Sequence, residues 1–218
     1  MTGEKPLWRV GYHAAPLEFT PWELYGFSHR FDDSARRFRT LYFAELDLTC
    51  LREVLADFRP NHAAQQRHIE RFGPRAAEDF APAPVTAKWR QENVLVPAAL
   101  EFDGRVVDLF DTETRQDIED RHVELLTAHG MEHLDLHEIT SDRRVLTQTI
   151  AGDLFDRGAA AVRFPSRLDG NACIALFEGR ATAHLVGSVI PLTDPAPAPL
   201  VTVSGQWKLD LESVTAED

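Results

Sequence analysis

The chain has 218 residues, of which 44% are hydrophobic, enough to bury one sizeable core in a single domain. Its 35 acidic residues outnumber its 23 basic ones, and the formal net charge is −12. A field of this sign repels phosphate backbones, so direct nucleic-acid binding is not expected. An anionic small substrate would therefore have to be held by a few arginines concentrated in one place.

The first third of the chain combines short strands with helices. Leu51, Leu55 and Phe58 recur at helical spacing, and Asn61 and Gly73 are typical of the start and the end of a helix. In chain order we expect a strand over 7–12, an irregular passage over 16–27, a strand over 39–44, a helix over 49–58, a helix from Asn61 to Gly73, and a loop over 74–84.

The middle of the chain predicts a hairpin. Segments 92–102 and 105–110 are apolar and flank Asp103-Gly104, a pair that favours a tight two-residue turn. Proline cannot donate a backbone hydrogen bond, so Pro97 marks the first segment as an edge strand or an interrupted one.

Helices and strands alternate irregularly in the remainder. We expect a helix over 118–129 ended by Gly130, a helix around Leu146, Ile150 and Leu154 with Ser141 as its cap and Gly158 at its end, strands over 159–164 and 172–177 separated by Asp169-Gly170, a loop over 195–199, and a final strand pair around Gly205. This order favours an α+β fold in which helices flank one mixed sheet. The whole chain, 1–218, is expected to form one domain, with C-terminal strands within 178–211 and a short acidic tail.

The cysteines and the absence of a targeting segment bear on the cellular location of the protein. Cys50 and Cys173 lie in apolar periodic segments, as is typical of buried free thiols in a reducing compartment. No signal peptide or membrane span is evident, so we expect a cytoplasmic protein without a membrane partner.

Three histidines, His129, His133 and His137, recur every four residues and would suit zinc on one continuous helix. Gly130 breaks that helix and Leu134, Leu136 and Ile139 alternate as in a strand, so no metal site is expected.

Signatures of common nucleophilic or phosphate-binding sites are missing from the sequence. Three groups of segments are more informative: Trp8-Arg9-Val10-Gly11 with Ser28-His29-Arg30-Phe31; Arg39-Thr40-Leu41-Tyr42-Phe43-Ala44 with Cys50-Leu51-Arg52-Glu53-Val54-Leu55; and Val162-Arg163-Phe164-Pro165-Ser166-Arg167 with Asn171-Ala172-Cys173-Ile174-Ala175-Leu176-Phe177.

Taken together and in this order, these segments resemble the RES family, named for its arginine, glutamate and serine. The resemblance covers about residues 7–177. It implies a fold similar to that of ADP-ribosyltransferases and an activity that splits NAD at the nicotinamide–ribose bond, with NAD as substrate and no separate cofactor. It also implies a bacterial toxin paired with an Xre-type antitoxin, and such a toxin can form a homo-oligomer.

The resemblance also implies roles for five residues. Arg9 and Arg30 match the two arginines of the family, Tyr42 its tyrosine, Glu53 its glutamate and Ser166 its serine. Glu53, Arg30 and Ser166 are then the expected catalytic residues, and Arg9, Arg30, Tyr42 and Ser166 the expected NAD-binding residues. The sequence departs from the family pattern in three places: His29 replaces a frequent glycine, Arg167 follows the serine directly, and Thr147-Gln148 replaces the usual Ser-Gln that opens the late helix.

The expected chemistry is consistent with these residue types. Breaking the nicotinamide–ribose bond builds positive charge on the ribose, which a fixed carboxylate stabilises. A guanidinium group can bind two phosphate oxygens of a pyrophosphate at the same time. By helical geometry Glu53 lies away from the apolar stripe, which suits either a cleft or an ordinary solvated face. Two alternatives stay open: transfer of ADP-ribose to a protein, and a RES-like interaction module without catalysis.

Overall fold

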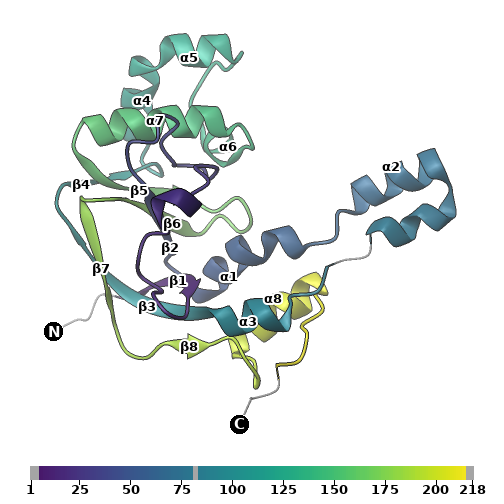
Figure 1. The fold of residues 1–218 in the computed structure, drawn as a ribbon. Coiled ribbons are helices and arrows are strands. Elements are labelled where there is room, and N and C mark those ends of the chain that lie inside the picture. The colour runs from purple at the N-terminus through teal and green to yellow at the C-terminus, as the bar shows by residue number, and fades with distance from the viewer. Residues whose placement is uncertain (1–4, 81–82, 215–218) are drawn as a thin grey trace.

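The computed structural model describes residues 5–80 and 83–214, so residues 215–218 of the acidic tail lie outside the described residues. A mixed sheet forms the centre of the fold (Figure 1). Its strand order is β4-β5-β6-β2-β1-β3-β7, with β8 also beside β3; β4 and β5 are parallel and the other pairs antiparallel. The strands are β1 Leu7–Tyr12, β2 Thr40–Ala44, β3 Asn93–Phe102, β4 Arg105–Asp108, β5 Ala159–Pro165, β6 Ala172–Phe177, β7 Ala181–Leu185 and β8 Ile190–Pro191.

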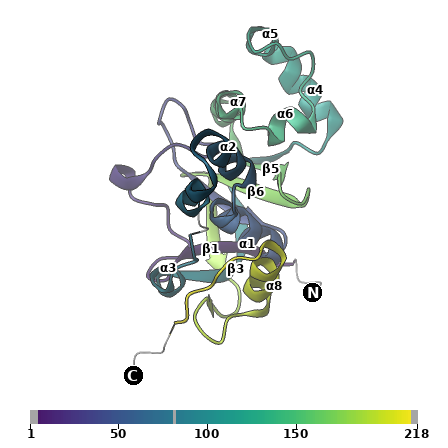
Figure 2. The ribbon, with the colours of Figure 1, turned by 90° about the vertical axis from the view of Figure 1, so that its right-hand side faces the viewer.

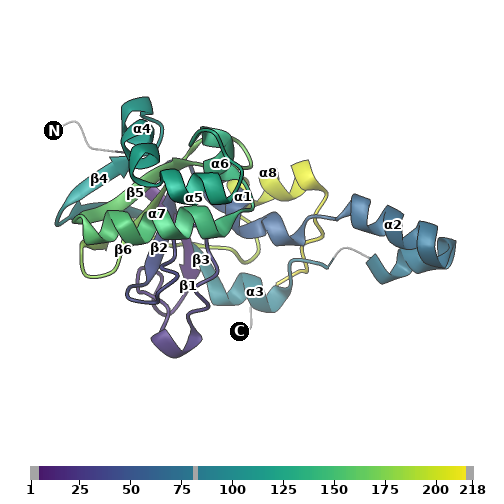
Figure 3. The same cartoon turned by 90° about the horizontal axis from the view of Figure 1, so that it is seen from above.

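Helices lie at both ends of this sheet, which establishes the expected α+β class (Figures 1 and 2). One group comprises α4 Thr112–Arg121, α5 Val123–Ala128, α6 Leu136–Thr140 and α7 Arg144–Asp156, and the other α1 Asp47–Leu55, α3 Ala87–Glu92 and α8 Ala198–Trp207. α2, His62–Phe72, extends away from the rest (Figure 3). Short 3-10 turns are η1 Trp22–Leu24, η2 Ala56–Phe58 and η3 Pro74–Phe80. No helix of the described part is long and apolar enough to cross a membrane.

The strands bury side chains on both faces of the sheet. In β2, Leu41 and Phe43 pack into one apolar cluster, whereas Tyr42 and Ala44 face a second, larger one. This alternation is the period-2 pattern of a strand, and it fixes which side chains share a face. Tyr42 therefore lies on the same side of the sheet as α1, whose Leu51 and Leu55 are fully buried in the larger cluster.

The predicted hairpin at Asp103-Gly104 is wrong. β3 pairs with β1 and β7, whereas β4 pairs with β5 at the other end of the strand order. Because only two residues connect β3 to β4, the sheet must curve until its two ends approach each other. Gly104 has a φ of +137°, and a Cβ there would lie 2.6 Å from the Gly158 carbonyl oxygen.

Pro97 lies in an interior strand, so the edge-strand alternative is wrong and the interrupted pairing is confirmed. β8 pairs with β3 at Val94 and Leu95, and β7 pairs with it from Ala98 onward. Pro97 occupies the interval between the two, where no ladder partner needs its missing N–H group.

Three helical predictions need correction. The helix predicted over 118–129 is split at His122 into α4 and α5. The strand-like segment around Leu136 is α6, because so short an apolar run does not distinguish the two periods. Ser141 ends α6 and Arg143 precedes α7, so Ser141 is not the cap of the second helix.

The final strand pair around Gly205 is also wrong. Within the C-terminal region predicted to hold strands, 178–211, β7 and β8 form, but Gly205 lies inside α8. The β-branched residues around Val201 favour a strand by propensity. However, the buried residues Leu200, Val203 and Ser204 recur at helical spacing, and burial against the core overrides that propensity.

Candidate active site

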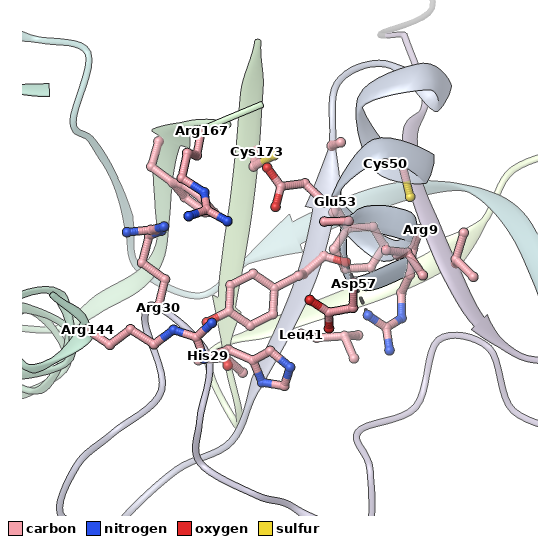
Figure 4. A pocket seen from close by; sticks show the side chains of 18 of the residues that line it. Arg9, His29, Arg30, Leu41, Cys50, Glu53, Asp57, Arg144, Arg167 and Cys173 are labelled. Carbon is pink, nitrogen blue, oxygen red and sulfur yellow. Dashed lines mark hydrogen bonds between the residues drawn. The ribbon is translucent and has the colours of Figure 1, made fainter. Parts of the chain in front are cut away.

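The described residues enclose a hollow of about 470 Å³, a size typical of small-molecule sites. Its walls come from segments far apart in the sequence: β1 and β2, the loop before β2, α1, the start of α7 and the turn after β5. Figure 4 shows how the polar side chains converge on it. The charged groups among its lining residues are Arg9, Arg30, Arg144, Arg167, Glu53, Asp57 and Asp142, with His29 beside them.

The Glu53 carboxylate is oriented by a hydrogen bond from Ser166. Glu53 is an exposed residue of α1 that lines the hollow, and its Oε1 lies 2.5 Å from the Ser166 Oγ. Ser166 is buried, with 2% exposure, and its Oγ accepts a hydrogen bond from the Leu168 N–H at 3.0 Å. The serine hydroxyl hydrogen is therefore directed to Glu53. Ser166 does not itself line the hollow, so its contact is with the carboxylate.

A second contact fixes α1 against the same turn. Arg52 Nη1 donates to Asp169 Oδ2 at 2.7 Å, and Thr49 Oγ1 donates to the same oxygen at 2.8 Å. Asp169 lies in the β5–β6 connection that also carries Ser166. This ion pair and the Ser166–Glu53 hydrogen bond together set the position of the Glu53 carboxylate.

Arg9 reaches the hollow from β1. Its Nε donates to the Pro16 carbonyl oxygen at 3.0 Å and its Nη1 to the Tyr42 carbonyl oxygen at 3.2 Å. Burial lowers the pKa of Arg9 to about 10, which leaves the guanidinium charged at neutral pH. The two carbonyls fix the plane of the guanidinium, and its remaining N–H groups donate to no protein atom of the described residues.

Arg30 lines the hollow and is hydrogen-bonded to the end of α6. Its Nη1 donates to the carbonyl oxygens of Ile139 and Ser141 at 2.6 and 2.5 Å, and its Nη2 to that of Thr140 at 3.1 Å. These carbonyls form the C-terminal end of α6, where a cation is favoured. Burial lowers the pKa of Arg30. Both Nη1 hydrogens are thus used within the protein, and among the described contacts Nε and one Nη2 hydrogen remain for a ligand.

Tyr42 presents its aromatic ring to the hollow, because its hydroxyl is hydrogen-bonded within the protein. The Tyr42 hydroxyl accepts from the Phe31 N–H at 2.8 Å and donates to Asp32 Oδ1 at 3.3 Å. Burial raises the pKa of Tyr42 well above its ordinary value, so the hydroxyl stays protonated. The aromatic face is therefore the part of Tyr42 that a ligand in the hollow meets.

The structure brings two further arginines, Arg144 and Arg167, to the hollow. Arg144, at the start of α7, donates to the Ser28 carbonyl oxygen and lines the hollow. Arg167 also lines it and pairs with Asp142. Arg9, Arg30, Arg144 and Arg167 together outnumber the three lining carboxylates, in a chain whose net charge is −12. The order of motifs flagged Arg167 but left its role open, and no sequence signal marked Arg144.

The two cysteines and the His129, His133 and His137 series add no charged group to the hollow. Cys50 and Cys173 are buried free thiols on the inner wall, and burial raises the pKa of Cys50 to about 12. The His129, His133 and His137 series forms no metal cluster among residues 5–80 and 83–214, and His133 instead pairs with Glu119 at 3.1 Å.

The comparisons agree with this architecture. The profile of the RES domain matches residues 6–195, so this chain belongs to the RES domain family and the resemblance seen in the sequence is confirmed. No curated protein matches the chain. The solved "M. tuberculosis MbcT-MbcA toxin-antitoxin complex" contains a chain of similar fold, with a TM-score of 0.52 and 14% identity over 94% of this chain and 88% of that one.

Proposed function

We propose that this chain is a cytoplasmic toxin that cleaves the nicotinamide–ribose bond of NAD, as a glycohydrolase or phosphorylase. The observation that carries the proposal is the Glu53 carboxylate, held by Ser166 and facing a hollow that Arg30 also lines. Membership of the RES domain family supports it, as does the similarity of the fold to a chain of a toxin–antitoxin complex.

In this proposal Glu53 supplies the electrostatic stabilisation. Positive charge develops on the ribose as its bond to nicotinamide lengthens, and a carboxylate already fixed in place stabilises that charge without reorganising. Nicotinamide leaves as a neutral molecule, so no strong acid is needed near it. Ser166 acts as a positioning residue, because its contact is with Glu53 and not with the hollow.

The arginines supply the binding of the pyrophosphate. Arg9 and Arg30 each keep some N–H groups that no described protein atom occupies, and Arg144 and Arg167 add two further guanidinium groups on the same hollow. Guanidinium groups bind phosphate oxygens in a bidentate manner. NAD is the substrate in this scheme, and no other cofactor is invoked.

An antitoxin partner is part of the proposal. The similar structure is described as a toxin–antitoxin complex, and an Xre-type antitoxin is the partner that the family resemblance implies. Expression of the chain alone should then stop growth and lower cellular NAD. Normal growth and normal NAD would favour the catalytically inactive interaction module instead.

Nicotinamide release from NAD by the purified protein tests the enzymatic part. The wild type should release nicotinamide, Glu53→Gln should not, and Glu124→Gln, at an exposed position on α5, should match the wild type. Equal release by wild type and Glu53→Gln would refute the proposed role of Glu53. NAD labelled in the ADP-ribose part separates the acceptors: label on protein indicates transfer, whereas free ADP-ribose or its phosphate indicates hydrolysis or phosphorolysis.

A further inference from the structure

A fully buried carboxylate, Asp32, lies beneath the hollow, outside the group of residues that the motifs identified. Asp32 is 0% exposed. The Asp32 Oδ1 accepts a hydrogen bond from the Tyr25 hydroxyl at 2.6 Å and another from the Thr40 hydroxyl. The Asp32 Oδ2 accepts a hydrogen bond from the backbone N–H of His29 at 2.7 Å. Burial alone would raise the pKa of Asp32, but the hydrogen bonds from His29, Thr40 and Tyr25 outweigh it and lower the pKa to about 2. The carboxylate is therefore ionised.

His29 connects this buried charge to the hollow. Its Nδ1 lies 3.1 Å from Asp32 Oδ2, while its side chain is 61% exposed and lines the hollow. An ionised carboxylate can only accept, so Nδ1 carries the hydrogen and the Nε2 lone pair is presented outward. Figure 4 shows His29 and Glu53 on opposite sides of the hollow.

We propose that His29 is the general base of the reaction, taking a proton from the hydroxyl-bearing acceptor of ADP-ribose, with Asp32 as its positioning residue. This inference rests on the proposed cleavage of NAD. With water as acceptor, a bond forms between the water oxygen and ribose C1′ and the C1′–nitrogen bond breaks, leaving its electron pair on nicotinamide. One water proton goes to His29 Nε2 and then to solvent, and the other stays on the new hydroxyl.

The other titratable groups around the hollow suit this role less well. The hydroxyls of Tyr25 and Tyr42 both donate to Asp32, and burial raises the pKa of each. Glu53 is held by Ser166 and serves the ribose. In addition, a carboxylate such as Asp57 is by type a weaker base than an imidazole.

Two further charged side chains face the same space. Arg144, on α7, lines the hollow beside His29 (Figure 4). Asp142 also lines the hollow, but it is paired with Arg167. Of the lining side chains described here, His29 alone combines an oriented nitrogen lone pair with a buried carboxylate behind it.

The sharpest test is His29→Asn, because the asparagine amide can still donate to Asp32 while the base at Nε2 is removed. Nicotinamide release should fall about 100-fold in kcat with little change in KM. The decline of the wild-type rate on acidification should disappear, and imidazole should restore part of the rate to His29→Gly. His133→Gln is the matched control, since His133 pairs through Nδ1 with Glu119 at the same 3.1 Å but lies outside the hollow.

The outcomes separate the two proposals. If the wild type releases nicotinamide and His29→Asn has the same kcat and pH profile, the role of His29 is overturned but the proposed cleavage of NAD is not. A rise in KM alone, without imidazole rescue, would also overturn it. No release by the wild type would overturn NAD cleavage itself. If the variants do not fold, carbethoxylation of the wild-type protein, followed by peptide mass analysis, replaces them: activity that persists after full modification of His29 would overturn the inference.

Discussion

The Ser166 hydroxyl oxygen lies 2.5 Å from Oε1 of Glu53, although 113 residues separate the two in the chain. The hydroxyl hydrogen can point only to the carboxylate, because Ser166 Oγ already accepts from the Leu168 N–H. A glutamate on an exposed helix face would otherwise sample several rotamers. This one contact therefore turns a flexible side chain into an oriented charge.

Replacing Ser166 with alanine should lower kcat for nicotinamide release about 10- to 100-fold, which corresponds to the loss of one hydrogen bond to a charged group. The KM for NAD should change little, because Ser166 does not line the hollow. The matched control is Ser204→Ala: Ser204 is a buried serine of α8 that bonds to the Leu200 carbonyl oxygen. A kcat in Ser166→Ala equal to that of the control would contradict the positioning role.

Arg30→Lys should both destabilise the protein and weaken NAD cleavage. The guanidinium spans the carbonyl oxygens of Ile139, Thr140 and Ser141, and an ammonium group cannot reproduce this planar arrangement. We expect the free energy of unfolding in urea to fall by about 2 kcal/mol. Arg143→Lys is the control, since Arg143 is exposed and bonds to one carbonyl oxygen, that of His129, at 3.1 Å. Equal stability of the two variants would refute the structural role of Arg30.

Asp32 should make stability depend on acidity. Its pKa of about 2 in the folded protein lies below the ordinary value of 3.8, so its contribution is fully present above pH 4 and is lost as the pH falls toward 2. We expect wild type to exceed Asp32→Asn by about 2 kcal/mol in unfolding free energy near neutral pH. The gap should narrow between pH 4 and 2 in denaturant titrations, and a gap independent of pH would contradict this assignment.

Gly11→Ala should disturb the Arg9 side of the site. A Cβ at Gly11 would lie 2.3 Å from the Pro16 carbonyl oxygen, which also accepts a hydrogen bond from Arg9 Nε. The added methyl group should cost about 2 kcal/mol of stability and raise the KM for NAD. At Gly26 a Cβ meets only the Ser28 Oγ, at 3.6 Å, so Gly26→Ala serves as control. Thermal melting and initial rates distinguish the two, and indistinguishable behaviour would rule out the clash.

Part of the fold and of the site follows from local sequence. The apolar stripe of α1 specifies which face of this helix is buried, and thereby places Glu53 on the opposite face. The order of the motifs predicted that Arg9, Arg30, Tyr42 and Glu53 belong together, and all four line one hollow. The role of each in catalysis stays a prediction.

Long-range pairing decided the rest. A strand's partners are chosen by hydrogen bonds that local composition does not encode, so the sequence could not show that β3 and β4 are separated by four other strands in the strand order. Packing likewise turned the segment around Gly205 into a helix. Only the folded chain brings Arg144 from α7 and the His29–Asp32 pair to the hollow, because a site assembled across several elements depends on how those elements pack.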